Sequence, residues 1–274
     1  MRRLLALLLP VLLLVAGTTT SQAQSPTLYV CNQGEATISV IDMESQTVET
    51  TVDLKERGFS PNAKPHHVVA EPDGEYWYVT LIGENTILKF NRNNEIVDRT
   101  SSFEVPGLMA LHDDSDRLYV GRSMSAVDPP QSIGVLDRSS MTVEEQVDTF
   151  FPRPHPIAVE TDGEHAFVAS LATNQLMGLD TASGETTLTR LGGDTQTLVQ
   201  FALTPDGSTL IAGGSERASC CSLTPPRPRR CRSPTRCRSG SSRGTPSSAR
   251  TEPRPTCRTR NPTPSASSIS RTRP

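Results

Sequence analysis

Short apolar runs alternate with polar turns along most of the chain, and this alternation repeats. Four segments share an apolar run, a polar turn and a second apolar run: KPHHVVAEPDGEYWYV (64–79), VPGLMALHDDSDRLYV (105–120), RPHPIAVETDGEHAFV (153–168) and TQTLVQFALTPDGSTLI (195–211). Short runs rich in Val, Ile, Thr and aromatic residues, bounded by turn residues, are typical of β-strands. No segment after the N-terminal region has a sustained helical period, so the pattern predicts an all-β chain.

Further apolar runs follow each repeated pair. Third runs are ATISVIDMES (36–45), NTILKFNRNN (85–94), QSIGVLDRSS (131–140) and NQLMGLDTAS (174–183), and fourth runs include QTVETTVDL (46–54) and ETTLTRL (185–191). From Tyr29 the same position of the pattern recurs at Tyr78, Tyr119, Phe167 and Leu210, in steps of 49, 41, 48 and 43 residues. Four antiparallel strands in about 40–45 residues form one blade of a β-propeller. A β-sandwich is the alternative, but a sandwich does not repeat a blade motif at this spacing.

The repeats predict about four blades and the start of a fifth. Asp-Gly at 73–74, 162–163 and 206–207 supplies the positive φ that tight hairpin turns need. The first repeat begins at its second strand, TLYVCNQG (27–34), with no inner strand before it. An open ring leaves a strand edge unpaired, so we expect closure to need a strand from the far end of an intact chain.

These repeats resemble the YVTN-type β-propeller family. The resemblance lies in LYVCNQGEATISVIDMESQTV (28–48), EPDGEYWYVT (71–80) and ALTPDGSTLIAGG (202–214), and Tyr78-Val79-Thr80 is nearest to the family signature. It covers about residues 27–214. The resemblance implies a secreted or periplasmic protein with radially arranged four-stranded blades, seven of them in an intact form.

The first 23 residues have the layout of a secretory signal peptide. Arg2 and Arg3 precede the apolar run LLALLLPVLLLVAG (4–17), and Ser21 and Ala23 stand at the −3 and −1 positions of a cleavage site. The run is shorter than the about 20 apolar residues that cross a membrane comfortably. We therefore expect an exported chain, periplasmic or extracellular, with no membrane span after cleavage.

The composition changes after about residue 214. Up to Gly214 the chain has 13 Lys and Arg against 28 Asp and Glu, whereas residues 215–274 hold 14 Arg, no Lys and 2 Glu among many Pro and Ser. A stretch of this kind buries too little apolar surface to offset the cost of ordering. We expect a signal peptide over 1–23, propeller blades over 24–214, and a disordered Arg/Ser/Pro-rich tail over 215–274.

The tail has three interpretations: a basic interaction arm, a disordered linker, or an out-of-frame translation. Read one base out of frame, codons compatible with residues 242–271 can encode a strand, a Pro-Asp-Gly turn and the strand TVSVIDLE, which mirrors TISVIDMES (37–45). We therefore expect that a frameshift after about residue 214 truncates the propeller. Repeat units need neighbours on both sides, so the truncated chain should fold poorly or aggregate.

Charge narrows the possible partners. Residues 24–214 carry 11 basic and 28 acidic side chains, a net charge of −17. Nucleic-acid binding would require a basic face, so no nucleic-acid partner is expected. An acidic body favours cationic partners or metal cations.

Three histidines are the candidate metal- or haem-binding residues. His66, His67 and His155 stand just before the inner strand of their repeats, and equivalent positions of different blades converge at the central channel. Imidazole suits Zn, Cu, Fe and Ni, or axial ligation of a haem. The alternative is that each ring hydrogen-bonds the backbone, since Gly107 and Leu198 occupy the equivalent places in other repeats. His112 and His165 are expected to be solvated near turns.

No known catalytic motif is present: GxSxG, HExxH, GxxxxGK[ST] and CxxCH are all absent. The first hypothesis is therefore a binding or scaffold propeller that is no enzyme by its own residues. It would hold a protein, a peptide or a small molecule at the channel mouth. The second is a divalent-metal- or haem-dependent propeller enzyme, because lactonases, amine dehydrogenases and cytochrome-type nitrite reductases resemble this repeat. Its metal or haem would lie at the same histidines.

Overall fold

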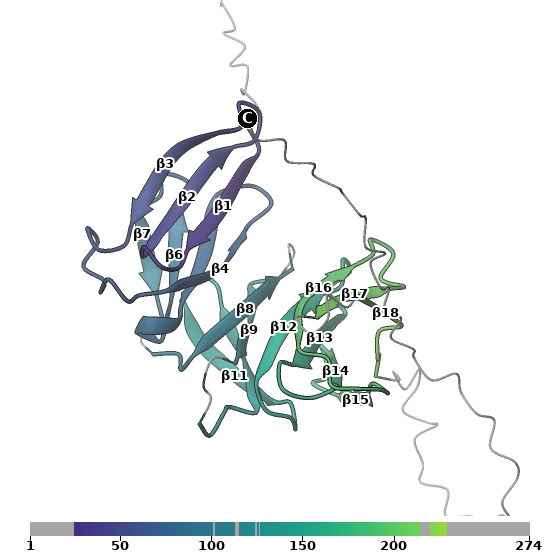
Figure 1. Cartoon of the computed structure of the whole chain (residues 1–274). Helices are drawn as coiled ribbons and strands as arrows, with labels where there is room; N and C mark the ends of the chain where they lie inside the picture. Colours follow the sequence, from purple (N-terminus) through teal and green to yellow (C-terminus); the bar gives the residue numbers. More distant parts are fainter. Residues whose placement is uncertain are drawn as a thin grey trace, which may run out of the picture.

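The chain folds into five small antiparallel β-sheets that succeed one another as the blades of a propeller (Figure 1). The computed structural model describes residues 25–228, apart from residues 101, 113–114, 124, 126 and 215–219. The expected signal peptide and most of the Arg-rich tail lie outside the described residues. The only helix in the described part is the short 3₁₀ helix η1 (Ile82–Glu84), which confirms the all-β prediction.

Each blade takes its strands from one continuous stretch of sequence, in chain order. Blade 1 has β1 (Thr27–Asn32), β2 (Thr37–Asp42) and β3 (Thr47–Asp53). Blade 2 has β4 (Pro65–Ala70), β5 (Tyr76–Leu81), β6 (Thr86–Asn91) and β7 (Ile96–Arg99). Blade 3 has β8 (Pro106–Leu111), β9 (Arg117–Arg122), β10 (Ser132–Asp137) and β11 (Thr142–Asp148). Blade 4 has β12 (Pro154–Val159), β13 (His165–Ser170), β14 (Gln175–Asp180) and β15 (Thr186–Arg190). Blade 5 has β16 (Leu198–Leu203), β17 (Leu210–Gly214) and β18 (Cys220–Leu223).

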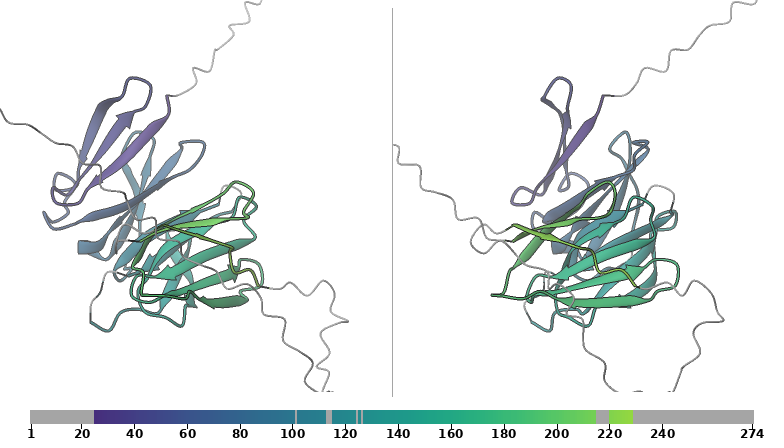
Figure 2. Two further views of the ribbon diagram at one scale, coloured as in Figure 1. Left: turned by 45° about the vertical axis from the view of Figure 1, so that its right-hand side comes forward. Right: turned by 90° about the vertical axis from the view of Figure 1, so that its right-hand side faces the viewer.

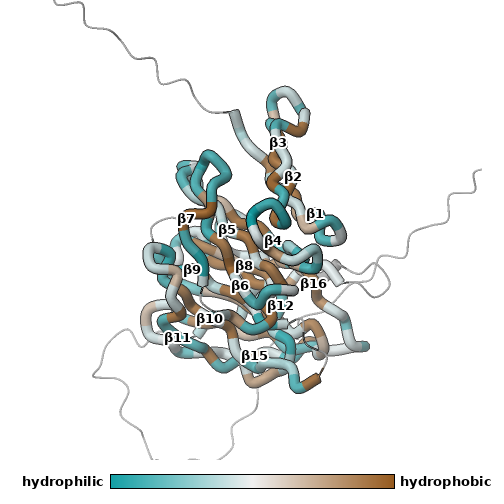
Figure 3. The backbone as a smooth tube through the Cα atoms, turned by 90° about the vertical axis from the view of Figure 1, so that its left-hand side faces the viewer, coloured by the Kyte–Doolittle hydropathy of each residue, from teal (hydrophilic) through white to brown (hydrophobic). Residues whose placement is uncertain are grey.

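The inner strands β4, β8, β12 and β16 lie next to one another and bring the blades together at the centre. The first and last blades stand at the two ends of an arc, as the turned views also show (Figure 2). Apolar residues follow the strands and polar residues gather at the turns that join them (Figure 3). Consequently the core consists of layers between neighbouring sheets.

The Asp-Gly hairpins form as the sequence predicts. Gly74, Gly163 and Gly207 have φ of 68°, 70° and 64°, in the left-handed region that glycine adopts without a steric penalty. Each of these glycines lies in the turn between the first two strands of its repeat. These turns set the register of the hairpins, and with it which side chains face each neighbouring blade.

Blade 1 lacks an inner strand among the described residues, as expected. Its β1 pairs only with β2, in the register that β5 and β6 adopt in blade 2. One face of blade 1 packs on blade 2, whereas the other carries the cross-strand row Leu28, Ile41 and Val48. Leu28 and Val48 are 45% and 58% exposed, so this row is uncovered.

Aromatic stacking joins blade 1 to blade 2. Trp77, the only tryptophan of the chain, is fully buried between Tyr29 and Phe90, with ring centroids 4.6 and 4.0 Å away. Its indole N–H donates to the carbonyl of Asn91 at 3.2 Å. Cys31 packs against the same core, and burial raises the pKa of its thiol to about 12. A buried thiol in an apolar core behaves as a small hydrophobic side chain.

Blade 5 corrects the expected boundary at residue 214. Strand β18 lies inside the stretch expected to be disordered and pairs antiparallel with β17, with Leu223 opposite Leu210. Leu223 is 3% exposed and belongs to the core between blades 4 and 5. The register of β16 and β17 also shifts the fifth repeat by one residue: Ile211, and not Leu210, corresponds to Tyr78.

Candidate functional site

A bulge interrupts the start of every inner strand, and the candidate histidines lie in these bulges. Pairing with the second strand skips between Pro65 and Val68 in blade 2 and between Pro154 and Ile157 in blade 4. The skipped residues are His66 and His67, and His155 with Pro156. A bulge releases residues from the alternation of the ladder and redirects their side chains, which is common beside functional sites.

The inner strands of blades 2, 3 and 4 each begin with a proline, and the residue before that proline has a left-handed backbone. Lys64, Val105 and Arg153 have φ of 52°, 45° and 55°. This conformation is unfavourable for residues with a Cβ, and most of all for β-branched Val105. The same local strain therefore recurs three times at one end of the inner strands, as is often found at binding sites.

Equivalent histidines from two non-adjacent blades meet at this end. The ring centroids of His66 and His155 are 5.5 Å apart, with 41° between the ring planes. The corresponding residue of the blade between them is Gly107, where a Cβ would lie 2.8 Å from Ser123 Oγ. Glycine at this position therefore lets the inner strand of blade 3 lie close to Ser123 and Gly121 of its own blade.

Each of the three histidines has its Nδ1 atom in a hydrogen bond. Gln33 Nε2 donates to His66 Nδ1 at 3.2 Å, and the backbone N–H of Met109 donates to His67 Nδ1 at 3.2 Å. Ser123 Oγ lies 2.5 Å from His155 Nδ1. Because an accepting Nδ1 leaves the proton of a neutral ring on Nε2, His66 and His67 present Nε2–H donors.

Neighbouring strands hold these rings in place. Thr80 is fully buried, accepts a hydrogen bond from the His67 N–H at 3.1 Å and donates to the Gly107 carbonyl at 3.0 Å. It thereby ties the bulge of blade 2 to blade 3. The Nε2 atom of His66 is buried and has no hydrogen-bond partner among the described residues. A buried donor without an acceptor is costly, which marks this atom as a place for a ligand.

All three rings are neutral at pH 7. Burial lowers the pKa of His66. Burial, followed by the charge of His66, lowers the pKa of His67 to about 4, and burial, His66, His67 and Arg153 lower that of His155 to about 3. The cluster is thus a set of uncharged imidazoles.

The cluster does not fit a three-histidine metal centre as it stands. Metal ligation through Nε2 needs a lone pair on that atom, usually with Nδ1–H donating elsewhere, but His67 Nδ1 accepts the N–H of Met109. In the described residues no group of three or more His, Cys, Asp and Glu side chains is arranged to hold a metal ion. A metal would require His67 to turn or to stay outside the ligand set.

The expectation that His112 and His165 are solvated is wrong for His165. His165 is 6% exposed and donates from Nδ1 to Glu160 Oε2 at 2.7 Å, while His112 Nε2 lies 2.8 Å from the carbonyl of Thr161. Sequence reasoning missed the buried Glu160–His165 pair, and the only available signal was His165 at an apolar strand position.

Comparisons with known proteins show the fold class of the chain. No protein-family model matches the chain, and none of the curated proteins matches it. Among solved structures, it resembles hydrazine synthase of Kuenenia stuttgartiensis, with a TM-score of 0.52 and 20% identity over 59% of this chain and 46% of that one. It also resembles selenomethionine-substituted virginiamycin B lyase of Staphylococcus aureus, with a TM-score of 0.57 and 16% identity over 72% of this chain and 63% of that one.

At these identities the similarity shows the fold: the chain is a β-propeller protein. It spans about half to two thirds of the length of these two structures. Within the described residues no helix is long and apolar enough to cross a membrane.

Proposed function

We propose that the chain is an exported, YVTN-type propeller that acts as a binding module, with its ligand site at the bulged starts of the inner strands. The observation that carries this proposal is the meeting of His66 and His155, beside His67, at one end of the central strands. The bulge recurs in every described inner strand, and in blades 2 and 4 it carries histidines whose rings are neutral.

The chemistry of the cluster defines the class of ligand. His66 and His67 offer Nε2–H donors, and the His66 donor is unsatisfied. Neutral donors favour an oxygen acceptor, such as a peptide carbonyl or a carboxylate. Both rings are partly exposed, but the Nε2 atom of His66 is buried, so the His66 ring must turn for a ligand to bind this atom. We infer a small molecule or a peptide bearing such an oxygen.

NMR spectroscopy of ¹⁵N-histidine-labelled protein tests this function. Acetate and N-methylacetamide are the smallest carboxylate and amide probes. We expect saturable shifts of the His66 Nε2 resonance that disappear in His155→Ala, while the His112 resonances stay in place as an internal control. If the imidazole signals do not move with either probe, or if only His112 responds, the proposal is wrong.

The second candidate is a metal- or haem-dependent propeller enzyme. The close approach of two neutral imidazoles favours it, because neutral rings are the form that ligates metals. Titration calorimetry with Zn²⁺ and Cu²⁺ alone separates the two functions. Tight binding that is lost in both His66→Ala and His155→Ala would support a metal centre, whereas binding indifferent to both variants would refute it.

A further inference from the structure

A second site lies at the opposite end of the inner strands, where a carboxylate of one blade binds a guanidinium of the next. Glu71 follows β4 and accepts from Arg138 Nη1 at 2.9 Å, while Glu160 follows β12 and accepts from Arg227 Nε at 2.8 Å. Both pairs are separated by 67 residues in the sequence. The same recognition geometry therefore occurs twice in the propeller.

Each guanidinium is also held by a hairpin carbonyl of its own blade. Arg138 Nη2 donates to the carbonyl of Ser115, and Arg227 Nη2 donates to that of Gly207. A Cβ at Gly207 would lie 2.9 Å from Glu160 Oε1, so glycine is what lets this hairpin close over the carboxylate. Carboxylate on one side and carbonyl on the other form a fork that matches guanidinium.

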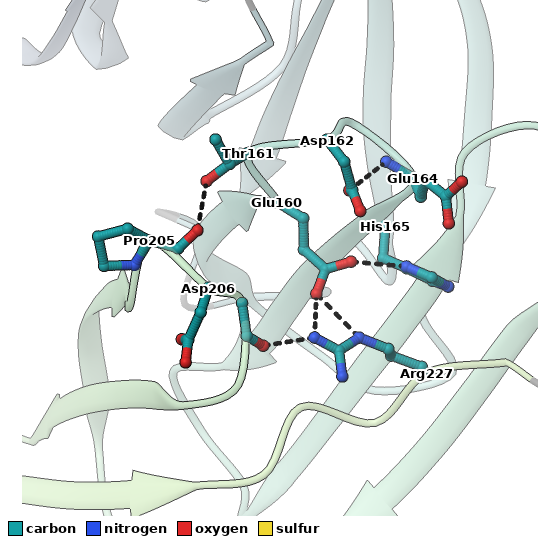
Figure 4. Close-up of a pocket in the computed structure, with 9 residues that line it drawn as sticks. Glu160, Thr161, Asp162, Glu164, His165, Pro205, Asp206 and Arg227 are labelled. Atoms are coloured by element: carbon teal, nitrogen blue, oxygen red, sulfur yellow. Dashed lines mark hydrogen bonds and ion pairs between the residues drawn. The ribbon is translucent and has the colours of Figure 1, made fainter.

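The two sites differ in how well they are closed. The Arg138 and Glu71 side chains are 9% and 13% exposed, and Tyr78 Oη also donates to Glu71 at 2.6 Å. Glu160 is 5% exposed, but Arg227 is 38% exposed and belongs to an irregular segment after β18. Glu160 is instead oriented by His165, through its second oxygen (Figure 4). The second site is thus built like the first, but its guanidinium is accessible.

A cavity of about 370 Å³ adjoins this exposed guanidinium. Besides Glu160, the carboxylates Asp162, Glu164 and Asp206 line it, and among the described residues Arg227 is the only Lys or Arg in the lining (Figure 4). The lining therefore has an excess of negative charge even with Arg227 in place. Such a pocket attracts a cation and disfavours anions.

We propose that this pocket is a recognition site for an arginine side chain of a partner peptide, and that in the chain as written Arg227 occupies it as an internal ligand. Glu160 and Gly207 lie before residue 214, so a frame restored after that residue would keep both acceptors and lose this occupant. Displacement of Arg227 opens Glu160 and the Gly207 carbonyl to the incoming guanidinium. The site is independent of the histidine cluster, because it lies at the other end of the inner strands.

Calorimetry with Nα-acetyl-arginine amide tests this assignment on the full chain, with wild type, Arg227→Ala and Arg227→Gln. Both variants should bind the probe at least tenfold more tightly than wild type, because the competitor is gone. The neutral isostere Nα-acetyl-citrulline amide should bind neither. Adding Glu160→Gln to Arg227→Ala should abolish binding, and Gly207→Ala should do the same by filling the fork.

Arg138→Ala is the matched control, because it empties the enclosed copy of the site and should not gain affinity for the probe. Far-UV circular dichroism confirms that each variant is folded, and Arg227→Gln keeps the side-chain length if Arg227→Ala unfolds. The proposal is overturned if wild type and both Arg227 variants bind equally, if citrulline binds as well as arginine, or if binding survives the loss of Glu160.

Discussion

Replacing His155 by asparagine should remove much of the acid sensitivity of this fold. His155 is 6% exposed, and burial with neighbouring positive charges lowers its pKa from 6.5 to about 3. Between about pH 6.5 and pH 3, His155 therefore binds a proton in the unfolded chain but not in the folded protein. Stability from this residue is complete above pH 6.5, falls as the pH falls, and stops falling near pH 3.

The size of this effect follows from the two pKa values. Over the whole window it amounts to about 5 kcal/mol, and between pH 7.5 and pH 5 to about 2 kcal/mol. Asparagine cannot titrate but can still hydrogen-bond Ser123, so His155→Asn should cost only about 1–2 kcal/mol at pH 7.5. At pH 5 the difference in the free energy of unfolding between wild type and His155→Asn should be smaller than at pH 7.5 by about 2 kcal/mol.

Urea unfolding at a series of pH values measures how the free energy of unfolding depends on pH. The fluorescence of Trp77, the only tryptophan of the chain, and far-UV circular dichroism serve as probes. His112→Asn, a substitution of the same type at the other end of the inner strands, is the matched control. Parallel pH profiles for wild type and His155→Asn would refute the reasoning, because they would show that His155 titrates alike in the folded and unfolded states.

Three further predictions concern the ends of the propeller. Tyr29→Ala removes a ring stacked on Trp77 at 4.6 Å, so it should cost about 2 kcal/mol and increase acrylamide quenching of Trp77; unchanged quenching would contradict this. Lysine at both Leu28 and Val48 should reduce self-association of the uncovered blade 1 face in sedimentation velocity, and the idea fails if wild type is monomeric. Resequencing the DNA for residues 205–225 should reveal a single-base change that restores further repeats; an intact frame would make the Arg-rich tail a genuine part of the protein.

The sequence by itself determined the blades. Apolar runs with a period of two and Asp-Gly turns are local signals, because each strand and hairpin depends on the residues within it. They predicted the first three strands of blades 2 to 4 and the three strands of blade 1, which the structure confirms, and blade 1 has no inner strand among the described residues. They also placed His66 and His155 at equivalent positions of different repeats.

The tertiary structure alone decided which of these residues meet. His66 and His155 approach because a bulge redirects both side chains at the same end of their inner strands. Neither the bulge nor the protonation state of a ring is visible in a local pattern, since both arise from pairing and burial against other blades.

Long-range contacts also explain what the sequence pattern missed. Strand β18 lies in a stretch poor in apolar residues, but the free edge of β17 and the core contact of Leu223 suffice to order it. Glu160 and Arg227 are 67 residues apart, in segments with unrelated composition. They meet because consecutive blades place the end of an inner strand beside the segment that follows the third strand of the next blade, a proximity created by the stacking of sheets and by nothing in either segment.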